Sequence, residues 1–163
     1  MEEGRLQASG EGSTQGGEEV KRTRTRTLRG VIDIASGTTG KAQVVVDDGL
    51  INRGYKVTGF FVWNNAGTTS FISYLSFKSQ TLGANKMDAA NNSQFAWTWL
   101  GSGAGSSIER IIDPDHVAVR DMFVSIENAG GAERFNYMIV VEEYALSNDE
   151  AILNIIKEGS QSL

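Results

Sequence analysis

The chain has 163 residues, 40% of them hydrophobic, which is enough for one domain with a substantial core. It contains no cysteine, which excludes disulfides, thiolate metal sites and cysteine nucleophiles. A formal net charge of −5 excludes a surface that binds nucleic acid throughout, although a local basic segment is compatible with it. The N-terminal residues are neither apolar nor basic enough for a secretory signal, and no apolar run is long enough to span a membrane. We therefore expect a protein made in the cytoplasm.

Residues 1–19 are rich in Gly, Ser, Glu and Gln and contain one large apolar residue, Leu6, so they are predicted to form a flexible arm. A basic segment follows, with five cations at Lys21, Arg22, Arg24, Arg26 and Arg29. Its alternation of Arg and Thr is typical of a strand. Two interpretations remain open. The cations neutralise phosphates of a nucleic acid, or they protect an edge strand or pair it with an acidic neighbour.

Apolar and polar residues then alternate in a series of short segments that are separated by Gly-rich turns. The chain has nineteen glycines and one proline, a composition that favours an all-β fold over a helical bundle. The predicted strands lie at 28–34, 41–47, 54–64, 71–78, 95–100, 117–128 and 135–146, and 107–112 is either a short strand or a helical turn. The pattern predicts an antiparallel β-sandwich of about eight strands, with a jelly roll as its arrangement and a barrel as the alternative.

Three aromatic residues at a period of two give the one pattern that suggests a ligand. Phe95, Trp97 and Trp99 are expected on one face of a short strand, where such a row can stack on sugars or bases. A row of aromatics also suits a core or a subunit interface. The loop 113–116 contains two carboxylates and the only histidine, His116, and is predicted to be a turn, because it offers too few metal ligands and no nucleophile. We therefore predict no metal site, no cofactor and no enzymatic activity.

The C-terminal part predicts a strand, a turn and a helix in succession. The near-continuous apolar run in 135–146 favours a strand buried on both faces. Ser147 and Glu150 have the spacing of a capping box, which predicts a helix that ends near Gly159. The helix has an apolar face at Ala151, Ile152, Ile155 and Ile156, with Leu153 beside it. We expect this helix to dock on its own sheet or on a neighbouring subunit.

These segments suggest an arm at 1–27, a β-sandwich domain at 28–146 and a docking helix with its tail at 147–163. The whole chain, with its polar arm, Arg-rich segment and compact sandwich with long loops, resembles small single-jelly-roll virion proteins. The resemblance implies a coat or accessory virion protein, present in many copies in the virion, with arms that tie neighbouring copies together. We expect arm exchange and contacts between sheet faces to hold this homo-oligomer together, with other virion proteins as further partners. It also implies non-specific contact between the packaged genome and Lys21, Arg22, Arg24, Arg26 and Arg29. The alternative is a soluble glycan-binding module that uses Phe95, Trp97 and Trp99.

Overall fold

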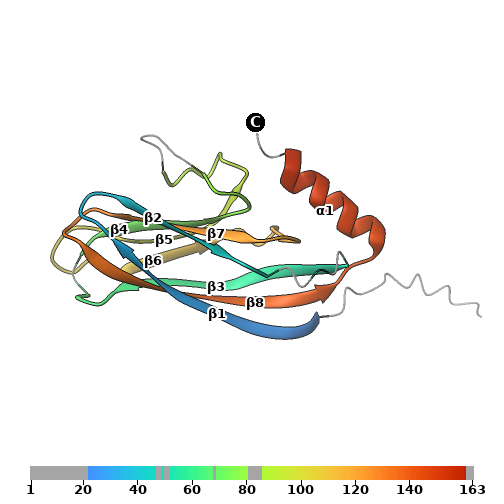
Figure 1. Cartoon of the computed structure of the whole chain (residues 1–163), viewed down its shortest axis with the longest axis horizontal. Helices are drawn as coiled ribbons and strands as arrows, with labels where there is room; N and C mark the ends of the chain where they lie inside the picture. The colour runs from blue at the N-terminus through green and yellow to red at the C-terminus, as the bar shows by residue number, and fades with distance from the viewer. Residues whose placement is uncertain (1–21, 47–48, 50–51, 68, 81–85, 161–163) are drawn as a thin grey trace, which may run out of the picture.

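A computed structural model describes residues 22–46, 49, 52–67, 69–80 and 86–160 of the chain. These residues form eight strands and one helix (Figure 1). The elements are β1 (Arg22–Ile34), β2 (Thr39–Val44), β3 (Arg53–Asn64), β4 (Phe71–Ser76), β5 (Gln94–Leu100), β6 (Ile108–Ile112), β7 (Met122–Asn128), β8 (Glu133–Ala145) and α1 (Asn148–Ser160). The predicted all-β fold with one short C-terminal helix is confirmed.

The strands form two antiparallel sheets that pack face to face as a sandwich. The three-stranded sheet has the order β1-β8-β3, and the five-stranded sheet has the order β2-β7-β4-β5-β6. The first strand thus pairs with the last, β2 pairs with β7, and β4 pairs with β5, which are three of the four nested pairs of a jelly roll; a pairing of β3 with β6 would complete the set. β6 pairs with β5 and lies in contact with β3 at one side of the sandwich.

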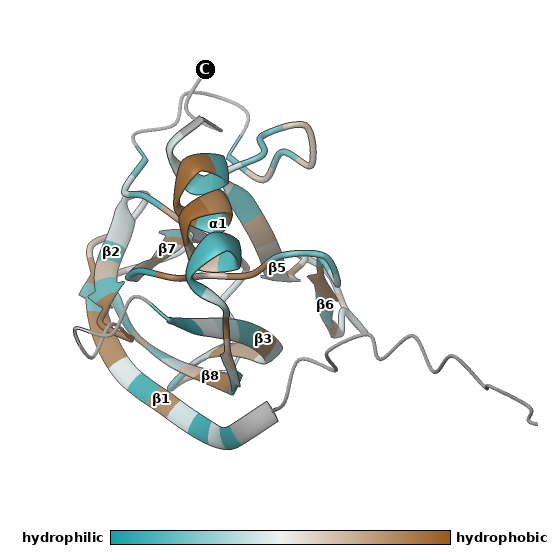
Figure 2. Cartoon of the chain, turned by 90° about the vertical axis from the view of Figure 1, so that its right-hand side faces the viewer, coloured by the Kyte–Doolittle hydropathy of each residue, from teal (hydrophilic) through white to brown (hydrophobic). Residues whose placement is uncertain are grey.

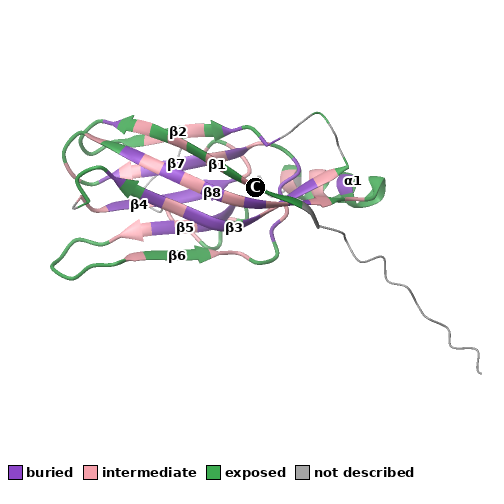
Figure 3. Ribbon diagram, turned by 90° about the horizontal axis from the view of Figure 1, so that it is seen from below, coloured by how far each residue is buried: buried purple, intermediate pink, exposed green. Residues whose placement is uncertain are grey.

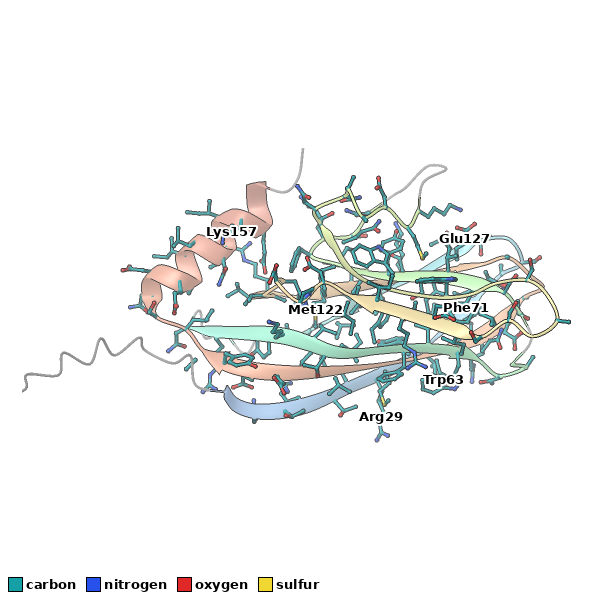
Figure 4. The ribbon with its side chains drawn as sticks, turned by 180° about the vertical axis from the view of Figure 1, so that it is seen from behind. Arg29, Trp63, Phe71, Met122, Glu127 and Lys157 are labelled. Atoms are coloured by element: carbon teal, nitrogen blue, oxygen red, sulfur yellow. The ribbon has the colours of Figure 1, made fainter. Side chains whose placement is uncertain are left out.

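Alternating residues of the two sheets fill the space between them, as Figure 3 shows by burial. Phe71 and Met122 both point into this core (Figure 4). β8 is the central strand of its sheet, and its residues alternate between buried and partly exposed. The prediction that this strand is buried on both faces is therefore wrong, because no further layer covers its outer face within the described residues.

Two predicted boundaries shift in the structure. β1 begins at Arg22, so the boundary expected between an arm and the sandwich at residue 28 falls inside a strand that is paired with β8. β7 begins at Met122, five residues later than expected, because the preceding segment turns to the other sheet, where Ala118 forms an isolated bridge with Tyr55. The ambiguous segment 107–112 contains a strand, β6, which begins at Ile108.

The polar segment between β4 and β5 was predicted to be an excursion loop, and its described part folds over the five-stranded sheet. Lys86 Nζ lies 2.6 Å from Glu127 Oε1 of β7, and the side chain of Gln94 donates to the carbonyl of Lys86. Tyr74, on the outer face of β4, is buried as a result. The outer face of the three-stranded sheet has no equivalent covering among the described residues.

The capping box predicted for the helix is present. The Ser147 amide donates to Glu150 Oε2 at 2.9 Å, and the Glu150 amide donates to Ser147 Oγ at 3.3 Å. The predicted docking on the chain's own sheet holds only in part, since Ala151 is fully buried and Ile155 partly buried, whereas Ile152, Leu153 and Ile156 are exposed. Docking on a neighbouring subunit stays a prediction. Within the described residues, no helix is long and apolar enough to cross a membrane.

Candidate functional site

The basic residues of β1 do not form one stripe, because strand alternation places them on opposite faces of the sheet. Arg24 and Arg26 share the inner face with Leu28 and Ile34, whereas Arg29 lies on the outer face. Figure 4 shows Arg29 pointing away from the sandwich. The prediction that β1 is an edge strand is correct, since β8 is its only partner among the described strands.

Arg24 belongs to a charge cluster centred on Glu143 of β8. The Glu143 side chain is fully buried, and its Oε2 lies 2.6 Å from Arg24 Nε, while Arg53 Nη1 donates to its Oε1. Burial raises the pKa of Glu143, but the hydrogen bond and positive charge of Arg24 and the charge of Arg53 outweigh burial, so the pKa lies below its usual value of 4.5. This carboxylate therefore ties the first residues of β1 and β3 to the central strand.

Glu143→Gln is expected to lower the free energy of unfolding by about 1–3 kcal/mol at pH 7, because the neutral amide weakens two charge-assisted hydrogen bonds. The pKa of the folded state lies below the unfolded value of 4.5, so the stabilisation is complete above pH 4.5 and is lost as the pH falls through the folded value. Urea unfolding at pH 7 and pH 3 measures both effects. Glu109→Gln, at an exposed carboxylate, is the control, and an equal loss in both variants would contradict the prediction.

The structure describes the side chains of three of the five residues that were predicted to contact phosphate. Lys21 and the side chain of Arg22 lie outside the described residues, and Arg24 is bound to Glu143. Arg26 and Arg29 take part in no ion pair within the described part of the chain. Of the three described cations of this segment, Arg29 lies on the outer surface of the sheet, where it can meet another molecule.

The predicted aromatic row is divided by a β-bulge. The register between β4 and β5 shifts at Leu75/Ser76, and Phe95 turns into the core, where its ring stacks on His116 with centroids 4.6 Å apart. Trp97 and Trp99 remain on the outer face of the five-stranded sheet and are partly exposed. Trp97 Nε1 donates to Gln94 Oε1 at 2.8 Å. The expectation that three aromatics share one face is therefore corrected to a pair.

A surface that sequence reasoning missed lies on the outer face of the three-stranded sheet. The outer strip, as we call it, consists of Val31 from β1, Met138 from β8, and Phe61 and Trp63 from β3, and the polar Asn136 of β8 lies between Val31 and Trp63 in the register. Val31 is 56% exposed and Trp63 is 42% exposed. The guanidinium carbon of Arg110 lies 4.6 Å from the centroid of the Phe61 ring and closes one side of the strip. Arg29 lies next to Met138 in the register, so the strip carries a cation at its other side.

The signal for the outer strip was present in the sequence. The segments 54–64 and 135–146 carry large apolar residues at both odd and even positions, and therefore on both faces of a strand. Such a pattern does not distinguish a third layer of the same chain from a contact with another molecule. Glu143 was also missed. Its position in an apolar run, at the same parity as Ile139 and Val141, is the signal for a buried carboxylate that needs cationic partners.

His116 has a structural position. Its Nε2 accepts a hydrogen bond from the Val57 amide at 2.8 Å, and its Nδ1 bonds to the carbonyl of Asp113. Burial lowers its pKa below the usual 6.5, so the imidazole is neutral with the proton on Nδ1. A pocket of about 390 Å³ beside it also contains Asp115 and Glu158. No group of three or more metal-ligating side chains lies close enough to hold an ion in the described part of the chain.

Comparison with known proteins does not assign the chain to a family. No family model matches it, and no curated protein matches it. One similar solved structure comes from the Bacillus endospore appendages, which form a family of disulfide-linked pili. It is 16% identical, covers 88% of this chain and 100% of that chain, and has a TM-score of 0.35. At this TM-score the similarity carries no conclusion about this chain.

Proposed function

We propose that the chain is a structural virion protein, coat or accessory, that assembles into a shell of many copies through its N-terminal arm and its exposed sheet face. The observation that carries the proposal is the outer strip, a group of exposed apolar side chains on a sheet face that no other described element covers. Exposed apolar side chains gathered on one face favour contact with another molecule, because covering them removes apolar surface from water.

The arm supplies a second kind of contact. Residues 1–21 precede an edge strand and are too polar to form a core of their own. Binding to a neighbour costs the arm conformational entropy but buries its backbone, and weak contacts of this kind add up when symmetry repeats them. Arg29 extends from the same face as the outer strip, and of the described cations of the basic segment it is our candidate for contact with packaged nucleic acid.

Purified protein is expected to form large regular particles or closed rings in light scattering and negative-stain microscopy. Val31→Asp should reduce particle formation at least about tenfold, because a charge in the strip must be desolvated in the contact. Thr38→Asp is the matched control, since Thr38 is exposed in the turn after β1 and lies outside the strip. Wild-type particles that survive Val31→Asp unchanged would contradict the role of the strip.

The same samples test the genome contact through absorbance at 260 nm before and after nuclease treatment. Retained nucleic acid that decreases in Arg29→Ala, with particles intact, would support contact at this residue. A stable monomer of about 17.6 kDa at high concentration would contradict assembly. That result would favour the glycan-binding alternative, with Trp97 and Trp99 as its surface pair.

A further inference from the structure

Helix α1 presents three of its four large apolar residues to solvent, and the fourth, Ile155, is partly buried. Ile152, Leu153 and Ile156 are 51%, 57% and 58% exposed, while Ala151 is fully buried on the side turned to the sandwich. At about 100° per residue, these three side chains occupy one arc of the helix opposite Ala151. Figure 2 shows the apolar residues as brown bands on the helix in front of the strands. A three-turn helix with an uncovered apolar arc needs a partner to be stable.

The charges along α1 indicate which partner fits. The first turn carries Asp149 and Glu150, and the last turn carries Lys157. Asp149 and Lys157 each lie four residues from Leu153, so the three share one ridge with a negative end, an apolar centre and a positive end. This ridge is complementary to itself when a second copy is reversed, because each Asp149 then meets a Lys157 and the helix dipoles oppose one another.

The surroundings of Leu153 leave room for such a contact. A pocket of about 410 Å³ opens beside it between α1 and the end of the sandwich, and its apolar walls come from Val117, Tyr144 and Leu146. A side chain from a second helix, such as Ile156 of the other copy, is of a suitable size and polarity to occupy it. The apolar arc and the pocket thus form one continuous surface at the end of the molecule that carries α1.

We propose that α1 is a self-association element that pairs antiparallel with α1 of a second copy, across a two-fold axis that passes near Leu153. This inference deepens the proposed function, since it names one of the contacts between subunits. It rests on that function because the pair is expected to form within a shell of many copies. A helix of 13 residues offers less area than the roughly 800 Å² per partner of a standard interface. The isolated pair is therefore weak and becomes effective where other contacts hold many copies together.

The absence of native cysteine makes a disulfide test direct. Leu153→Cys is expected to form a covalent dimer with itself under a mild oxidant, because two residues near the two-fold axis approach within disulfide range. Asp149→Cys and Lys157→Cys should each remain mostly monomeric when oxidised alone. A mixture of the two variants should form disulfide-linked heterodimers. Thr38→Cys, in an exposed turn, gives the background from random collisions. Circular dichroism of each reduced variant confirms that it is folded.

A reversible measurement accompanies the cross-linking. Ile156→Asp is expected to raise the dimer dissociation constant at least about tenfold in sedimentation equilibrium, whereas Val45→Asp, at a similarly exposed β-branched residue away from the helix, leaves it unchanged. Self-coupling of Asp149→Cys, no coupling of Leu153→Cys above background, or equal effects of the two Asp variants would overturn the antiparallel pair. Particles without helix coupling would refute this inference alone, and helix coupling without particles would refute only the proposed shell.

Discussion

Phe135→Ala is expected to lower the free energy of unfolding by about 3–5 kcal/mol, among the largest effects of any single substitution in this chain. The Phe135 side chain is fully buried, and its ring contacts Phe71 of the opposite sheet edge-on, with centroids 5.6 Å apart and planes at 76°. It lies between Ile32 and Asn64 on the neighbouring strands, so truncation leaves a cavity that joins both sheets. A domain of this size has only about 5–15 kcal/mol of stability.

Urea unfolding followed by tryptophan fluorescence measures this loss. Phe123→Ala is the matched control, because Phe123 lies on the partly exposed outer face of β7, and we expect it to cost about 1–2 kcal/mol. Phe135→Leu keeps most of the volume and should fall between wild type and Phe135→Ala. Equal losses for the two alanine variants would show that Phe135 does not link the sheets as described.

His116→Ala is expected to cost about 2–4 kcal/mol at pH 7.5, since it removes the stacking on Phe95 and leaves the buried Val57 amide without its acceptor. His116→Gln is the conservative variant, because its amide oxygen can accept from the same amide. We expect it to recover part of the loss. The measurement is again urea unfolding. No recovery in His116→Gln would assign the whole loss to the stacking on Phe95, and full recovery would assign it to the hydrogen bond.

The same residue predicts a pH dependence. The folded-state pKa of His116 lies below the usual 6.5, so the unfolded state binds the proton first and the wild type loses stability as the pH falls below 6.5. Burial raises the pKa of nearby Glu158 above its usual 4.5. This group therefore makes the folded state more stable as the pH falls toward 4.5, which is opposite to the effect of His116. The slope due to His116 should disappear in His116→Gln and persist in Glu158→Gln. A Glu158→Gln variant whose stability is constant from pH 7.5 to 5.5 would contradict this assignment.

Much of the fold was predictable, because its signals are local. Period-two alternation and Gly-rich turns determine where strands form, and the spacing of Ser147 and Glu150 determines where α1 begins. The segment 117–121 was assigned to a strand because its composition is apolar and β-branched. Its backbone instead bonds to β3, through a pairing with Tyr55 that is distant in sequence.

The candidate surfaces were less predictable because they depend on register and on partners. The alternation of Arg24 and Arg26 correctly predicted a shared face, but only the pairing with β8 shows that this face is the inner one and that Arg24 meets Glu143. One extra residue at the bulge turned Phe95 away from Trp97, a shift that alternation does not encode. Likewise, the amphipathic pattern of α1 predicts an apolar face but not what covers it.

The segment around His116 also protects an edge of the three-stranded sheet. Tyr55 and Ala118 exchange backbone hydrogen bonds, and His116 accepts from the Val57 amide. The edge of β3 that does not pair with β8 is therefore occupied along part of its length. Open strand edges are the templates on which β proteins aggregate. Protonation of His116 removes the acceptor of the Val57 amide, so it weakens one contact that holds this segment at the edge, while the backbone hydrogen bonds between Tyr55 and Ala118 remain. A pH low enough to protonate His116 should therefore make this edge more open to pairing with other strands, in competition with ordered assembly.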